Sequence, residues 1–235
     1  MIGLIFSYAK SAAVFAVSVC ACAAGITLVC LFTSDTFDLI MRLVGLAILL
    51  LALYAMSAAY AFSLLMKEID RLGGDACDCQ TLGARLQKIA HRILAGKLRG
   101  AVLLQYAYTQ VYRGLYKEAM HTVSDAVIAG KEGIKGDAAV CFCQIFYALK
   151  DAAYFANYYE RADETLAKRA DTKNARDRAQ INARRAALAA MRLHLHGDAA
   201  GALARLRDFD TEGVPALQRK NLAALCDKII EDSAG

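Results

Sequence analysis

Two long apolar runs without charge constrain this chain more than any other feature. Neither Ser11 to Phe32 nor Leu43 to Met66 contains a charged residue. A helix rises about 1.5 Å per residue, so each run is long enough to cross the roughly 30 Å hydrocarbon core of a bilayer. The sequence therefore predicts a transmembrane hairpin within residues 1–72, with spans at about 11–32 and 43–66, and a separate domain over residues 77–235.

Charges beside the two runs predict the side of the membrane on which the termini lie. The link at residues 33–38 contains acids and no base, whereas Lys10 precedes the first run and Lys67 and Arg71 follow the second. Basic residues near span ends stay in the cytoplasm. We therefore expect a multi-pass protein with two spans and a cytoplasmic C-terminal domain. Arg42 is the exception, and its long side chain would reach the outer headgroups.

A cleaved signal peptide is the alternative explanation of the first run. Lys10 would be the charged leader, and the cleavage site would lie at residues 21–23, Ala-Cys-Ala. The apolar run continues to Phe32, well beyond the roughly 7 to 15 residues of a signal core, which favours a retained span. No acid lies in either run, which argues against a proton relay or a transport site.

The domain that follows is mildly basic and contains an odd number of cysteines. It carries the whole net charge of +5, because acids and bases balance in the first 66 residues. This excess is too small and too dispersed for nucleic-acid binding, but it suits a position beside an anionic membrane surface. An odd cysteine count in a domain large enough to form its own core favours a reducing compartment.

Periodicity predicts that this domain is all helical. Apolar residues recur at every third or fourth position, no alternating strand pattern persists, and Gly73-Gly74 marks the predicted end of the second membrane helix. The predicted helices cover residues 80–95, 99–113, 116–130, 136–150, 153–169, 174–196, 199–208 and 215–231. Glycines lie in or beside the breaks, at Gly96, Gly114, Gly130, Gly133, Gly136 and Gly197.

Two of these helix-turn-helix segments resemble tetratricopeptide repeats. Gly114, Tyr116 and Ala119 match the turn glycine, the aromatic residue and the small residue of that family. Gly197 and Ala202 match it in a later copy, and a degenerate copy begins at residues 150–151. The resemblance covers about residues 99–209. It implies an α-solenoid that binds extended or helical peptides on its concave face.

The match departs from the family in places. The tryptophan of the family's first helix is absent, and Ala107 stands where the family has glycine. The segment from Pro215 to Ile230 would be a terminal cap. Its inward-facing residues would be Leu217, Leu222, Leu225 and Ile229.

Arginines of the helix predicted over 174–196 are candidate partner-binding residues. Arg178, Arg185 and Arg192 are seven residues apart and therefore share one helix face. The basic region around them also contains Lys168, Arg169, Lys173, Arg176 and Arg184. The functional interpretation is a groove for an acidic peptide or a contact with anionic lipid. The alternative is a solvated helix face.

Tyrosines are the second group of candidates. Tyr108 and Tyr112 would line the concave surface, where tyrosine rings bind at low entropic cost. Most other aromatic residues at helical spacing would be core. They include Tyr106, Tyr116, Phe146, Tyr147, Tyr154, Phe155, Tyr158 and Tyr159.

Neither a metal site nor an active site is predicted. Cys77 and Cys79, with Cys141 and Cys143, could form a four-thiolate zinc site, but one intervening residue is tighter than the usual spacing. The four histidines have no partner at a catalytic spacing, and no phosphate loop or nucleophile motif is present. We therefore expect a protein that is not an enzyme and that uses neither a metal nor another cofactor.

These features together predict a membrane-anchored scaffold or adaptor. It would bind a protein or peptide partner at the cytoplasmic membrane face, contact membrane lipid, and not bind nucleic acid. The first alternative is an accessory subunit of a larger membrane complex, held through its spans. The second is an enzyme or metal protein built on the helices, and both homo- and hetero-oligomers are compatible with the sequence.

Overall fold

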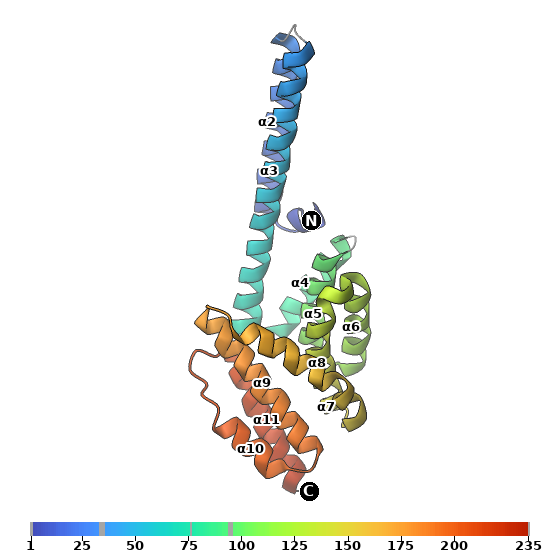
Figure 1. Cartoon of the computed structure of the whole chain (residues 1–235), viewed down its shortest axis with the longest axis vertical. Helices are drawn as coiled ribbons and strands as arrows, with labels where there is room; N and C mark the ends of the chain where they lie inside the picture. Colours follow the sequence, from blue (N-terminus) through green and yellow to red (C-terminus); the bar gives the residue numbers. More distant parts are fainter. Residues whose placement is uncertain (1, 33–35, 76, 94–95, 235) are drawn as a thin grey trace. The chain divides into compact units, whose positions relative to one another are not determined.

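The computed structural model of the protein describes residues 2–32, 36–75, 77–93 and 96–234, and these residues form helices and no strand. The predicted all-α class is therefore confirmed for the described residues (Figure 1). The chain divides into two compact units. The first is Met1–Lys67 with His91–Leu94, and the second is Glu68–Ala90 with Ala95–Gly235.

The first unit is built on two long helices. After the short α1 (Ile2–Ile5) come α2 (Ala9–Phe32) and α3 (Thr36–Ile69), which run antiparallel and side by side (Figure 1). The ring centres of Phe15 on α2 and Tyr54 on α3 are 6.0 Å apart. Gly25 of α2 packs against the side chain of Leu46 on α3. Residues 33–35 of the predicted acidic link lie outside the described residues.

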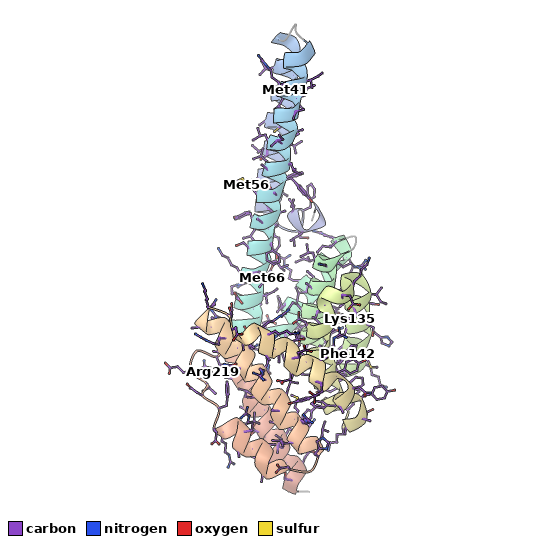
Figure 2. The ribbon with its side chains drawn as sticks, in the orientation of Figure 1. Met41, Met56, Met66, Lys135, Phe142 and Arg219 are labelled. Atoms are coloured by element: carbon purple, nitrogen blue, oxygen red, sulfur yellow. The ribbon has the colours of Figure 1, made fainter. Side chains whose placement is uncertain are left out.

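Most of the apolar surface of this hairpin is uncovered. Val17 is 69% exposed, Leu51 68% and Met56 67%. Figure 2 shows Met41 and Met56 projecting from α3. Both helices are long and apolar enough to cross a membrane, over Ser11–Leu28 and Ile40–Gly73. Little of either segment is buried within the protein, unlike the core helix of a soluble domain.

The second long helix does not end at Gly73-Gly74 as predicted. The α-helix α3 ends earlier, at Ile69, and the chain continues as one π-helical segment, η1 (Asp70–Asp75), that includes both glycines. A Cβ atom at Gly73 would lie only 2.9 Å from Cδ2 of Leu82. The glycine therefore allows η1 to pack closely against the next helix, rather than simply ending α3.

Helices follow along the rest of the chain. They are α4 (Cys79–Arg92), α5 (Lys97–Tyr112), α6 (Tyr116–Gly130), the 3₁₀ segment η2 (Lys131–Ile134), α7 (Lys135–Ala148), α8 (Ala152–Ala170), α9 (Ala175–Leu195), α10 (Ala199–Arg207) and α11 (Ala216–Ala234). Each predicted helix has a counterpart whose ends differ by no more than about three residues, which is the usual uncertainty of helix ends.

Three hairpins in this series share one turn geometry. They are α5–α6, α7–α8 and α9–α10, and their turn residues Gly114, Lys150 and Gly197 have φ angles of 74°, 55° and 86°. In each turn this residue donates its N–H to the carbonyl three residues earlier, and the following residue donates to the carbonyl five residues earlier. This is the Schellman ending of a helix, which favours glycine because φ is positive.

Packing is also equivalent at these hairpins. Seven residues before each turn residue lies a small side chain with no exposed surface: Ala107, Cys143 and Ala190. Ala119 and Ala202, both predicted as repeat-packing residues, are also fully buried. The predicted aromatic residue, Tyr116, is only partly buried beside the α5–α6 core. This arrangement is compatible with a helical-repeat domain.

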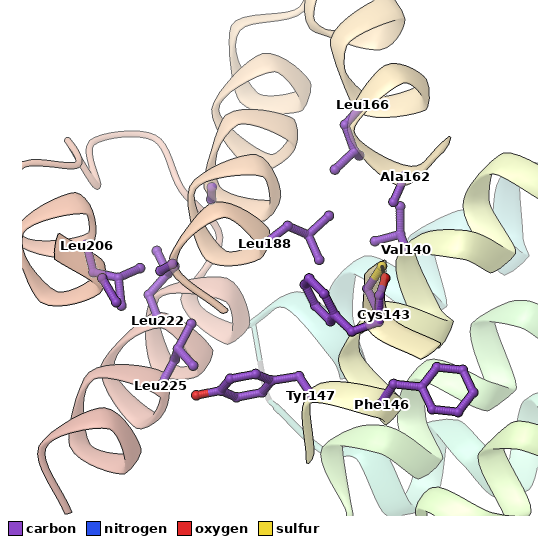
Figure 3. Packing of buried hydrophobic residues seen from close by; sticks show 14 of the residues in the cluster. Val140, Cys143, Phe146, Tyr147, Ala162, Leu166, Leu188, Leu206, Leu222 and Leu225 are labelled. Atoms are coloured by element: carbon purple, nitrogen blue, oxygen red, sulfur yellow. Dashed lines mark hydrogen bonds between the residues drawn. The ribbon is translucent and has the colours of Figure 1, made fainter. Parts of the chain in front are cut away.

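Two apolar clusters form the core of the second unit. One joins α5, α6 and α7, and the other joins α7 to α8, α9, α10 and α11. Figure 3 shows Val140 of α7, Leu166 of α8 and Leu188 of α9 in the second cluster. The predicted cap residues Leu217, Leu222, Leu225 and Ile229 are all buried, as expected. Because α7 contributes to both clusters, the hairpins form one continuous core.

Candidate functional site

A cavity of about 250 Å³ lies in the second unit. Its lining residues belong to the end of α3, η1, the start of α4, α5, α9 and the start of α11. Leu82, Thr109 and Gln218 are buried in its interior, whereas Asp70 and Asp177 are exposed at its rim. A cavity of about 150 Å³ can already admit a benzene ring, so this one can receive a side chain or a small molecule.

One wall of the cavity is a pair of stacked tyrosines on α5. Tyr108 and Tyr112 are four residues apart and share a helix face, with ring centres 6.4 Å apart and planes 24° apart. Burial raises the pKa of both hydroxyls, although nearby Arg184 acts in the opposite direction. Both side chains are therefore neutral hydrogen-bond donors at physiological pH.

The two hydroxyls differ in their partners. Tyr108 donates to the carbonyl oxygen of Asp137 on α7, at 3.2 Å. For Tyr112, no hydrogen bond of the hydroxyl is found among the described residues. The Tyr112 hydroxyl is therefore available to a ligand, whereas the Tyr108 hydroxyl holds α5 against α7.

Arg184 of α9 faces these tyrosines. Its Cζ atom lies 5.2 Å from the centre of the Tyr108 ring. Its Nε atom is buried and has no hydrogen-bond partner among the described residues, and no described carboxylate lies within ion-pairing distance. Arginine stays protonated in proteins, and a buried charge without a partner is destabilising. Such a group is retained at a cost in stability, as is common at binding sites.

Three predicted arginines occupy a different environment from Arg184. Arg185 Nε donates to Asp163 at 2.9 Å, and Arg192 lies 3.4 Å from Glu160 with its Cζ 4.5 Å above the Tyr159 ring. These partners belong to α8, so the two arginines hold α9 against α8. The third, Arg178, is exposed. The arginine spacing thus identified a shared face, but two of its members are paired within the protein.

A second polar cluster joins α7, α9 and α11. The Tyr147 hydroxyl lies 2.8 Å from His194 Nδ1, and His194 Nε2 lies 4.0 Å from Asp232, which also accepts a hydrogen bond from Lys150 at 2.9 Å. Lys228 Nζ lies 4.8 Å from the Tyr147 ring centre. Burial raises the pKa of Tyr147, so it is not a base near neutral pH. No serine or cysteine lines this pocket within the described chain, and its contacts tie three helices together.

The four cysteines of the two predicted pairs do not form one cluster. Cys141 and Cys143 of α7 are fully buried, and burial raises the pKa of Cys143 to about 12 and that of Cys141 further. Metal binding needs thiolates, which burial in apolar surroundings disfavours. Within the described ranges, no group of three or more cysteine, histidine or acidic residues could hold a metal ion.

The sequence pointed to two tyrosines of the cavity but not to its central cation. The heptad pattern does not separate Arg184 from the surrounding bases, because it does not show which arginine faces a neighbouring helix. The distinction appears only in the structure, where Glu160 and Asp163 of α8 pair with Arg192 and Arg185 but not with Arg184. Comparison with protein-family models, curated proteins and solved structures found no significant match to this chain.

Proposed function

We propose that this protein is a membrane-anchored helical-repeat scaffold that holds a protein partner at the cytoplasmic face of a membrane. Its second unit would bind the partner, and its apolar hairpin would confine the complex to the bilayer. Confinement raises the local concentration of the partner without a chemical step. The observation that carries this proposal is the polar cavity around Arg184, in which the buried Nε–H of this arginine and the Tyr112 hydroxyl have no hydrogen-bond partner among the described residues.

The exposed apolar surface of α2 and α3 supports the membrane anchor. Side chains such as Val17, Leu51 and Met56 are more than half exposed on the hairpin itself. Contiguous apolar surface of this length is unfavourable in water and favourable in lipid. The charge pattern around Lys10, Lys67 and Arg71 supports the orientation with the second unit in the cytoplasm.

The three hairpins with a common turn support a tetratricopeptide-like repeat. Gly114, Lys150 and Gly197 have the same position in their hairpins, and the small residue seven positions earlier is buried each time. Repeats of this kind stack in one direction and offer an extended binding surface. The cavity lined by α5, α9 and the start of α11 would be the polar part of that surface.

Site-specific photo-crosslinking in intact membranes tests the proposal. p-Benzoylphenylalanine would replace Tyr112 in the cavity, Met56 on α3, or the exposed Lys117 of α6 as a control. The scaffold predicts a protein adduct from position 112, recovered in the membrane fraction, and none from position 117. Absence of any protein adduct from position 112 would contradict it.

The accessory-subunit alternative is favoured by a different observation, the uncovered side chains along α3. Met56 is 67% exposed and could contact another membrane helix as well as lipid. In that case position 56 would give the protein adduct and position 112 would not. The same experiment therefore separates the two functions.

A further inference from the structure

Arg184 is a cation inside a cavity whose other charges do not neutralise it. Four charged side chains line the cavity: Arg176, Arg184, Asp70 and Asp177. The two acids and Arg176 are exposed at the rim, whereas the Arg184 side chain is mostly buried and its Nε fully so. Water screens the rim charges far more than the interior charge. The interior of the cavity therefore carries a net charge of +1.

The acid of the neighbouring helix α7 is already occupied. Asp137 is close enough to interact electrostatically with Arg184. Its carboxylate, however, accepts two hydrogen bonds from Arg169 of α8, at 2.5 and 2.7 Å. Arg184 instead has the face of the Tyr108 ring beside it, which is a weaker partner than a carboxylate.

We infer that this cavity is a binding site for a single carboxylate group carried on a compact, partly apolar body. The planar guanidinium of Arg184 matches a carboxylate with two parallel hydrogen bonds. The Tyr112 hydroxyl and the amide groups of Gln105 and Gln180 supply further donors along the walls. Where the carboxylate belongs to a protein partner, this inference rests on the proposed function.

Apolar residues define the rest of the ligand. Leu82, Pro215 and Leu217 line the same cavity, and two of them are buried. A few methylene groups or a short side chain would cover them, whereas a fully polar ligand would leave them unmatched. The ligand class is therefore a short aliphatic acid, either free or as an acidic side chain on a polypeptide.

The charge balance favours a carboxylate over a phosphate. One interior cation neutralises one negative charge, and a phosphate dianion would keep a second charge in a desolvated site beside the acidic rim. Asp70 and Asp177 would repel that second charge at the entrance. Comparing the affinity for phosphate with that for a carboxylate therefore tests this charge argument.

The test is a titration of the full-length protein in detergent micelles. Probes come in acid and amide pairs: pentanoate with pentanamide as the free acid, and acetyl-Ala-Glu-Ala-amide with acetyl-Ala-Gln-Ala-amide as the peptide. Binding is followed by the NMR signal of the Arg184 Nε–H group, assigned by its loss in Arg184→Gln. We expect at least one acid to bind at least tenfold more tightly than its amide, and inorganic phosphate to bind more weakly than that acid.

Three variants test whether the acid binds in the cavity. Calorimetry measures the affinity of each variant for the acid. Arg184→Gln should weaken acid binding at least tenfold, and Tyr112→Phe, which removes only a hydroxyl, should weaken it severalfold. The matched control Arg178→Gln removes an exposed arginine of the same helix and should leave binding unchanged. Severalfold weaker binding in Tyr112→Phe supports the site even if Arg184→Gln does not fold.

Each outcome decides the inference. Binding of pentanoate alone identifies a free acid as the ligand, and binding of the Glu peptide alone identifies a polypeptide segment. Equal binding of acids and amides, tighter binding of phosphate, or unchanged binding in both cavity variants would overturn the carboxylate site. If no acid binds in preference to its amide while the adduct at position 112 still forms, the scaffold stands and this inference fails.

Discussion

Arg184 and Tyr108 contact each other across the cavity, with the guanidinium carbon of the first 5.2 Å from the ring centre of the second. The two residues belong to α9 and α5, which lie in different hairpins. A cation over a tyrosine face is attracted, but less strongly than a cation beside a carboxylate. The protein thus holds this charge in place with only part of the stabilisation that a buried ion pair would provide.

Arg184→Met should separate stability from binding. Replacing a poorly paired buried charge by an apolar side chain of similar length is often neutral or stabilising by about 1–4 kcal/mol. We expect the unfolding temperature of the full-length protein in detergent to stay constant or rise by several degrees. Thermal unfolding followed by circular dichroism measures this. A fall of more than about 4 °C would show that Arg184 is mainly a structural residue.

The two cavity tyrosines should respond differently to loss of their hydroxyls. Tyr108→Phe removes the hydrogen bond from this hydroxyl to the Asp137 carbonyl and should lower the free energy of unfolding by about 1 kcal/mol. Tyr112→Phe removes a hydroxyl without a protein partner among the described residues and should change stability little. Urea unfolding of both variants measures the difference. Equal losses would contradict the assignment of Tyr108 as the tie to α7.

The hairpin turns predict unequal effects of alanine at two glycines. Gly197 has a φ angle of 86°, so Gly197→Ala should lower the free energy of unfolding by about 1–2 kcal/mol. Gly133 has ordinary contacts, the closest at 3.5 Å to Lys97, and no positive φ angle. Gly133→Ala is therefore the control and should have little effect. Similar losses in the two variants would argue against strain at the turn.

Buried thiols predict a loss of stability in alkali. Folding raises the pKa of Cys143 from 9.0 to about 12, because burial disfavours its thiolate. The folded state keeps this proton while the unfolded state releases it, so stability is complete below pH 9 and is lost as pH rises toward 12. Urea unfolding at pH 8 and pH 11 should differ by a few kcal/mol. Cys143→Ala should reduce that difference, and an unchanged difference would assign it to other groups.

Charges placed on the outer face of α3 should prevent membrane insertion. Ile48 and Leu51 are 64% and 68% exposed, and an arginine at either position opposes insertion by about 2.5–3.5 kcal/mol near the bilayer centre. We expect the double variant to become extractable by alkaline carbonate. Ile128→Arg, at a 76% exposed position on α6, is the control and should stay in the membrane fraction. Retention of the double variant would contradict a spanning α3.

The helices could be predicted from the sequence because their signals are local. Glycines and the apolar period located α5 to α11 to within about three residues, and the uncharged runs located α2 and α3. The α3 helix is longer than its apolar run because charged residues such as Lys67 and Glu68 are good helix formers. Hydropathy predicts which part of a helix can lie in lipid, but it does not predict where the helix ends.

The site could be predicted only in part because it depends on contacts between distant helices. Tyr108 and Tyr112 are predicted from the sequence as partner-binding tyrosines of a concave surface, and the structure brings them to one cavity. Arg184 was not distinguished from Arg185, since adjacent residues on a helix point about 100° apart and the partner helices decide which of the two is paired. That decision rests on Asp163, which lies 22 residues earlier on α8.

The three turns at Gly114, Lys150 and Gly197 are each closed by hydrogen bonds within their own few residues. The direction in which the chain returns at each bend is therefore set by its own local sequence. The packing between hairpins is not local, because α7 contributes to both apolar clusters, so deletion of one hairpin would expose apolar side chains of its neighbours to water.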